Sequence, residues 1–139
     1  MRRWLLLLSL AGCGAQAENQ WFTVTGNPVD ASVDTVQVNP VATKAKGNLR
    51  TMNVRVSRKE QRFNWEKTPY RSYESSVLFD CRARKANYIS ATFYAAPLWQ
   101  GPPGKTINYG NSPPPMLFRD ADPNPTNRII RAACQVTAG

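Results

Sequence analysis

Histidine is absent from this chain of 139 residues, which also holds only three Cys and nine acidic residues. Without an imidazole, no Ser-His or Cys-His nucleophile pair, no histidine metal ligand and no histidine acid–base catalyst can be built. The 18 Lys and Arg residues give a formal net charge of +9, which favours anionic partners. The missing residues therefore exclude many classes of enzyme and favour a binding role.

Sequence motifs for catalysis and for metal or cofactor binding are lacking as well. No G-x-S-x-G, S-x-x-K, P-loop or dinucleotide-binding pattern occurs. The segment from Asp120 begins like a calcium loop, but Pro125 stands where that loop needs Gly, and Arg131 stands where it needs Glu. We therefore expect no enzymatic activity, no metal site and no cofactor.

Long hydrophobic runs are also missing, and the most apolar stretch lies at the start of the chain. It runs from Trp4 to Ala11 behind two arginines, far short of the roughly 20 residues that a membrane-spanning helix needs. A short apolar run behind basic residues is typical of a secretory signal. We therefore expect an exported protein, located in the periplasm or at the outer membrane or cell surface of a bacterium.

Two processing sites fit this signal. The small-x-small pattern that ends at Ala17 predicts a signal peptide at residues 1–17 and a domain at 18–139. Alternatively, Leu10 to Cys13 resembles a bacterial lipobox, which would place a lipoprotein signal at residues 1–12 and lipidation at Cys13. In that second case, contact with the membrane would be made only through the lipid anchor.

Apolar residues that alternate with polar ones predict three main strands. The strand before Cys81 is the clearest of the three, and it places that cysteine on its inner face. The inward-facing residues predicted for the three strands are Tyr73, Ser75, Val77, Phe79 and Cys81; Met52, Val54 and Val56; and Ile89, Ala91 and Phe93. Shorter strands are predicted at residues 22–24, 33–38 and 116–118.

The connections between these strands differ in length. Only Arg82 to Asn87 separates two of the main strands, which favours an antiparallel hairpin with a basic tip. By contrast, nine of the nineteen residues from Pro97 to Pro115 are Pro or Gly. Proline cannot donate to a strand ladder, so we expect a long loop there.

A helix near the C-terminus is predicted to carry the last cysteine. Asn124 suits the N-cap and Pro125 the first helical position. The apolar residues Ile129, Ile130, Ala133 and Cys134 then share one face. With Cys13 in the signal or used as the lipid anchor, Cys81 and Cys134 remain as a pair with core-facing side chains in an oxidising compartment. We therefore expect a Cys81–Cys134 disulfide; the alternative is two separate buried thiols.

Together these elements predict an α+β fold that is mainly β. A single antiparallel sheet packs against one C-terminal helix, and the disulfide links the two.

In the order and spacing of its motifs, the chain resembles the bacterial surface-adhesin protein E family. The shared features are an exported N-terminus, an early Trp21, a strand at Val33-Asp34, the Phe79-Asp80-Cys81 motif followed by a basic turn, and Cys134 in a C-terminal helix. The resemblance spans roughly Trp21 to Gln135. It implies a small sheet with a disulfide-linked helix, exposed on the cell envelope, that engages host or environmental macromolecules.

Basic residues interleaved with aromatic ones are the candidate ligand-binding groups. They gather in the segment from Ser57 to Tyr73, predicted to connect two strands, and in the turn after Cys81. Arg forks and planar rings can grip anionic groups, but the same charges can also be a solvated surface that protects a sheet edge. The candidate residues are Arg58, Lys59, Arg62, Trp65, Lys67, Arg71, Arg82, Arg84 and Lys85.

The leading interpretation is therefore a non-enzymatic envelope protein that binds macromolecules through these basic loops. Candidate partners are extracellular-matrix proteins, sulfated glycans and lipopolysaccharide, and nucleic acid is not expected. The alternative is a structural or accessory periplasmic protein without a host ligand, whose charge serves solubility.

Overall fold

The computed structural model describes residues 20–135. The signal peptide at 1–17, the alternative lipoprotein signal at 1–12 and the lipidation site Cys13 lie outside these described residues. Within them, none of the helices has the length and apolar character needed to cross a bilayer.

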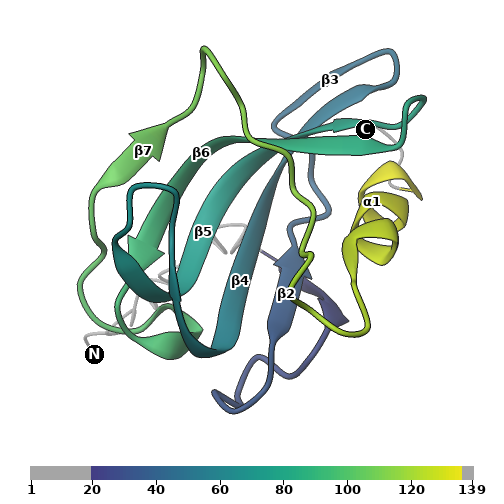
Figure 1. Ribbon diagram of the computed structural model, residues 1–139. Helices are drawn as coiled ribbons and strands as arrows, with labels where there is room; N and C mark the ends of the chain where they lie inside the picture. The colour runs from purple at the N-terminus through teal and green to yellow at the C-terminus, as the bar shows by residue number, and fades with distance from the viewer. Residues whose placement is uncertain (1–19, 136–139) are drawn as a thin grey trace, which may run out of the picture.

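The described chain folds into one antiparallel sheet with a helix against it, as predicted (Figure 1). The strand order across the sheet is β1-β2-β4-β5-β6-β7, and β3 pairs with the start of β4. The elements are β1 (Phe22–Thr25), β2 (Thr35–Val38), β3 (Lys44–Lys46), β4 (Leu49–Phe63), β5 (Pro69–Asp80), β6 (Lys85–Tyr94), the short turn η1 (Pro97–Trp99), β7 (Thr106–Asn108) and α1 (Thr126–Gln135).

The predicted alternation on β4 and β5 is confirmed. Met52, Val54 and Val56 on β4, together with Val77 and Phe79 on β5, are all fully buried on the inner face. This face meets α1, whose Ile129, Ile130 and Ala133 complete the core, and Met116 fills the space beside them. Burial of these apolar side chains is the main driving force that holds the helix against the sheet.

On β6 the predicted inner face is wrong in part, because a β-bulge changes the alternation. Ser76 pairs with Ser90, but the next residue, Val77, pairs with Tyr88. The extra residue, Ile89, moves its neighbours to the opposite face. Ala91 and Phe93 are therefore buried as predicted, whereas Tyr88 takes the inner position expected for Ile89, and Ala86 is buried as well.

The connections also differ from the prediction. The segment from Ser57 to Tyr73 is not a loop: β4 continues to Phe63 and β5 starts at Pro69, which leaves a tight turn at residues 64–68. An irregularity in the pairing between Ser57 and Arg62 hides the strand pattern there. The loop at 97–115 contains η1 and β7, and residues 116–118 form no strand, although Pro115 makes a single bridge to Asn87.

The helix begins at Thr126, one residue after the predicted first position Pro125, and the predicted capping residue and disulfide hold it. Asn124 Oδ1 accepts a hydrogen bond from the Thr126 amide at 2.9 Å, as expected of a capping side chain. The Cys81–Cys134 disulfide is present and joins the end of β5 to the last turn of α1. Arg50 on β4 also donates to the carbonyls of Ala133 and Cys134, at 3.3 and 3.1 Å. A cation at the helix C-terminus is favourable for the helix dipole.

Removal of the disulfide is expected to lower the free energy of unfolding by about 4 kcal/mol, because the bond closes a loop with a sequence separation of 53 residues. Urea unfolding of the Cys81→Ala/Cys134→Ala variant, compared with the parent protein, measures this difference. An unchanged unfolding midpoint would contradict the stabilising role assigned to the bond.

Candidate functional site

The inner face of the sheet is covered unevenly. Helix α1 packs against β1, β2, β4 and β5, whereas the hairpin turn at 64–68 and the segment at 115–120 lie over the other part of this face (Figure 1). Between these two segments lies a hollow lined by aromatic side chains. We call it the aromatic groove and define it by Phe63, Trp65, Tyr70, Tyr73, Tyr88 and Leu117.

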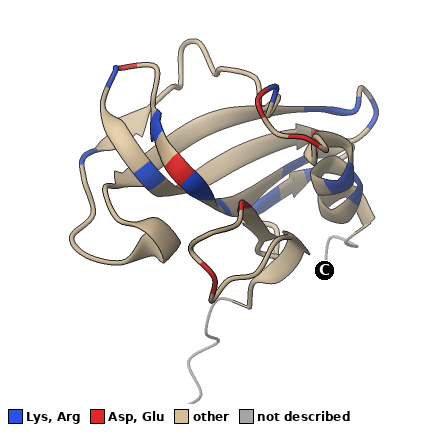
Figure 2. Cartoon of the chain, turned by 60° about the horizontal axis from the view of Figure 1, so that its bottom comes forward, with Lys and Arg blue, Asp and Glu red and all other residues tan. Residues whose placement is uncertain are grey.

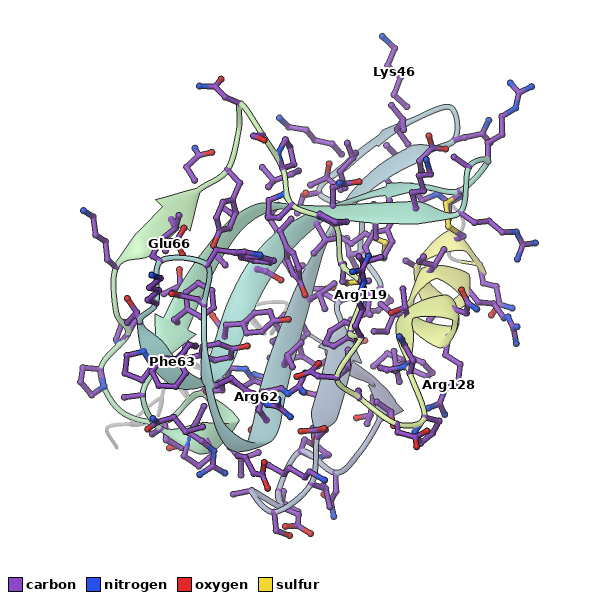
Figure 3. The ribbon with its side chains drawn as sticks, in the orientation of Figure 1. Lys46, Arg62, Phe63, Glu66, Arg119 and Arg128 are labelled. Carbon is purple, nitrogen blue, oxygen red and sulfur yellow. A yellow bond between two sulfur atoms is a disulfide. The ribbon has the colours of Figure 1, made fainter. Side chains whose placement is uncertain are left out.

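The aromatic groove consists of two connected hollows of about 270 and 400 Å³. Trp65, Tyr70, Tyr73 and Tyr88 line both of them. Figure 3 shows Phe63 and Glu66 on the hairpin and Arg119 on the segment across from it. Phe63 and Trp65 are 65% and 59% exposed, so large apolar surfaces stand at the rim of a concave site.

Ring-to-ring packing fixes the groove's lining. Trp65 meets Tyr88 and Tyr109 edge-on, with ring centroids 5.8 and 5.7 Å apart. Tyr73 packs against Phe93 at 5.4 Å and against Tyr70 at 5.7 Å. Such tilted and edge-to-face arrangements are the favoured ones for aromatic pairs. The groove is therefore built before any ligand arrives.

The phenols beneath the groove are paired and neutral. The hydroxyls of Tyr73 and Tyr88 form a buried hydrogen bond with each other. Burial raises the pKa of both groups above the ordinary value of 10. Burial and the neighbouring carboxylate of Glu66 raise the pKa of Tyr109 to about 12. These hydroxyls are therefore hydrogen-bonding groups and not nucleophiles at physiological pH.

Arg58 lies beside the groove as a buried ion-pair partner. It is only 4% exposed, and its guanidinium lies 2.8 Å from Asp120 and 3.4 Å from Asp34. Burial opposes its charge, yet the carboxylates of Asp34 and Asp120 raise the pKa of Arg58 above its ordinary value. This arginine joins the loop before β2 to the segment after β7, so its guanidinium is held within the protein.

The other basic candidates near the hairpin fall into two groups. Arg71 donates to the carbonyls of Arg58 and Ala31, both at 3.0 Å, and Arg62 pairs with Asp120 at 2.8 Å. Lys59 and Lys67 are exposed, with no ion pair among residues 20–135. In the segment predicted to be one basic loop, the arginines therefore make contacts within the protein, and Lys59 and Lys67 are the two lysines left free.

A second set of cations gathers at the opposite end of β5. Strand pairing aligns Lys46 with Leu49, Leu49 with Asp80, and Asp80 with Lys85. At about 4.8 Å per strand, Lys46 and Lys85 stand about 14 Å apart across this end. Figure 2 shows Lys and Arg gathered on the strand ends and helix here. We call this surface the basic end and define it by the exposed residues Lys44, Lys46, Arg82, Arg84 and Lys85.

Asp80 is the carboxylate within the basic end, and the turn after β5 uses it. Its Oδ1 accepts the amides of Arg82 and Ala83 at 3.1 and 3.0 Å. The basic tip therefore does not extend the Ser57–Tyr73 segment. That segment ends at Tyr73, and the remaining seven residues of β5, Glu74 to Asp80, separate it from the tip by about 23 Å of strand. Lys44 and Lys46 were not among the sequence candidates, although their alternation before the Gly47-Asn48 turn was a usable signal.

The opposite face of the sheet carries a cation held between aromatic rings. The Arg55 guanidinium lies 4.5 Å from the centre of the Trp21 ring and 3.9 Å from that of Trp99. Its Nε donates to Gln37 Oε1 at 2.7 Å, and the Trp99 indole donates to the Tyr73 carbonyl at 3.0 Å. Cation–π contacts of this kind stabilise the outer face, and the indole hydrogen bond fastens η1 to β5.

The two candidate surfaces expose side chains suited to binding. In the part of the chain that the structure describes, no three Cys, Asp or Glu side chains gather as a metal site requires. What the two candidate surfaces offer is planar apolar area at one end of β5 and unpaired positive charge at the other.

Comparison with known proteins gives one match. A family model described as surface-adhesin protein E matches residues 21–135, almost the whole described chain. No curated protein and no solved structure matches it.

The five tyrosines are expected to ionise at a higher pH in the folded protein than in the unfolded chain. Each has a folded-state pKa above 10, so its proton is held more tightly in the folded chain than in the unfolded one. The resulting stabilisation is complete below pH 10 and is lost as the pH rises through the folded values, about 12 for Tyr109. Tyrosinate absorbance, followed against pH in native and denatured samples, measures the difference in ionisation pH. Native phenols that ionise at pH 10 would contradict the prediction.

Replacement of Arg58 by Ala is expected to lower the free energy of unfolding by about 2 kcal/mol or more, because it leaves Asp34 and Asp120 without their buried partner. Lys59→Ala, one position away and exposed, is the matched control and should change stability by less than about 0.5 kcal/mol. Equal effects of the two variants in urea unfolding would show that Arg58 has no such structural role.

Proposed function

The chain belongs to the surface-adhesin protein E family, and on that premise we propose that it binds anionic macromolecules through the basic end. Membership of the family implies a non-enzymatic, exported protein of the cell surface that contacts host macromolecules. The partner class proposed here is sulfated glycan, with lipopolysaccharide and extracellular-matrix proteins as the other anionic surfaces to be tested.

One observation carries this proposal: five exposed cations from two adjacent turns share one end of the sheet. Their carboxylate neighbour, Asp80, is engaged by backbone amides. Their backbone is already fixed by strand pairing and a tight turn, so the side chains are the main groups that must be ordered when an anion binds. A row of cations about 14 Å long also suits a polymer with repeated anionic groups.

Export and anchoring form the second part of the proposal. A signal at residues 1–17, or a lipobox at Cys13, would deliver the domain to the envelope. The described domain starts at residue 20, so a lipid on Cys13 would place it close to the membrane surface. In the periplasm the same domain would act as an accessory protein, which is the second candidate function.

The experiment is salt elution from immobilised heparin. Removal of three cations from the basic end, in Arg82→Gln/Arg84→Gln/Lys85→Gln, is expected to weaken binding by about ten- to a hundredfold, because each exposed charge contributes up to about 1 kcal/mol. The matched control, Lys59→Gln/Lys67→Gln/Lys105→Gln, removes the same net charge elsewhere and should elute near the parent protein.

The two triple variants separate a local site from general charge. Equal losses in both would mean that net charge alone drives the binding, which would overturn the assignment to the basic end. A parent protein that binds neither heparin, lipopolysaccharide nor matrix protein at low salt would favour the accessory role instead. The parent protein and both triple variants have the same N-terminal segment, so the comparison does not depend on where the signal is cleaved.

A further inference from the structure

We propose that the aromatic groove binds an extended, proline-rich peptide segment, in addition to the anion binding assigned to the basic end. The groove lies at the other end of β5 and shares no residue with the basic end. Its occupant is inferred from three features: the exposed rings at its rim, the polar groups that line it, and the proline tract that already forms one of its walls.

The rim exposes apolar area that a ligand can cover. Phe63 and Trp65 from the hairpin are 65% and 59% exposed, and Leu117 across the groove is 39% exposed. Exposed Trp at the mouth of a packed hollow is a frequent anchor for binding energy. The hairpin turn that carries Trp65 is itself fixed, because Asn64 accepts the Thr68 amide through its side chain at 2.8 Å and the Lys67 amide through its carbonyl at 2.9 Å.

Two hydrogen-bond donors at the groove are free to meet a ligand. The Tyr73 and Tyr88 hydroxyls bond to each other, and the Asp120 carboxylate is held by Arg58 and Arg62. Within residues 20–135, the Trp65 indole N–H and the Arg119 guanidinium have no hydrogen-bond or ion-pair partner. A ligand with outward-facing carbonyl oxygens can therefore satisfy both donors.

A polyproline II segment has this composition. Its carbonyls point outward without internal hydrogen bonds, its prolines carry no N–H, and its conformation is largely set before binding. Tyr- and Trp-lined grooves are a recurrent site for such segments.

The chain's own proline tract runs beside β6 at the edge of this surface. The Pro114 carbonyl accepts the Tyr88 amide at 2.9 Å, and the Pro113 carbonyl accepts the Asn87 side chain at 3.1 Å. Pro115 then lines the same hollow as Trp65 and remains exposed. A second proline segment would lie between this prolyl ring and the indole, with carbonyls toward Trp65 Nε1 and Arg119.

The test uses acetylated, amidated decaproline as the probe and ¹⁵N-labelled protein. We expect a saturable shift of the Trp65 indole signal, which is assigned by its absence in Trp65→Phe. A Gly-Ser peptide of equal length should cause no shift. Trp65→Ala should weaken decaproline binding tenfold or more, whereas Phe22→Ala removes an aromatic ring that is equally exposed, at 58%, outside the groove and should leave it unchanged.

Several outcomes would overturn the proposal. These are an unshifted Trp65 signal, an equal loss in Phe22→Ala, or a saturable shift with cellohexaose in place of decaproline, which would assign the groove to sugar. Phe63→Ala provides a second rim variant in case Trp65→Ala fails to fold. The Arg82→Gln/Arg84→Gln/Lys85→Gln protein should keep full decaproline binding, which separates this site from the basic end.

Discussion

The pairing of β4 with β5 is the constraint on which the rest of the structure depends. These two strands are the longest in the sheet, and their register sets the positions of both candidate surfaces. At one end, pairing of Leu49 with Asp80 aligns β3 and the β5–β6 turn, so that five cations share a surface. At the other end, the irregular pairing between Ser57 and Arg62 precedes the hairpin turn that carries Trp65 over the inner face. The same strand pair also supplies Cys81 and Arg50, the two attachments of α1.

The sequence was sufficient for the fold class because its periodic signals were strong. Alternation before Cys81, and three- to four-residue spacing before Cys134, predicted the sheet, the helix and the bond between them, all of which the structure confirms. The bulge at Ile89 and the continuation of β4 beyond Ser57 could not be predicted, since both depend on how a partner strand pairs and not on local residue type. Prolines likewise concealed β7, a three-residue strand that needs β6 beside it.

The candidate site was less predictable for a physical reason. The sequence does not indicate whether a basic side chain faces solvent or pairs with a carboxylate inside the protein. Arg58 and Lys59 are adjacent, yet Arg58 is buried in ion pairs and Lys59 is exposed. The partners of Arg58, Asp34 and Asp120, are far away along the chain. The aromatic groove could not be predicted either, because its lining comes from the hairpin turn, β5, β6 and the segment at 115–120, and no single stretch of sequence contains it.

The length of β5 has a consequence for how this protein meets its surroundings. Two surfaces of different chemistry lie along this strand and share no residue, so filling one leaves the residues of the other open. A molecule with this layout can bridge a charged polymer and a protein tail at the same time. When two weak binding sites on one molecule are occupied together, the combined affinity exceeds that of either site, and the complex persists when one contact briefly dissociates.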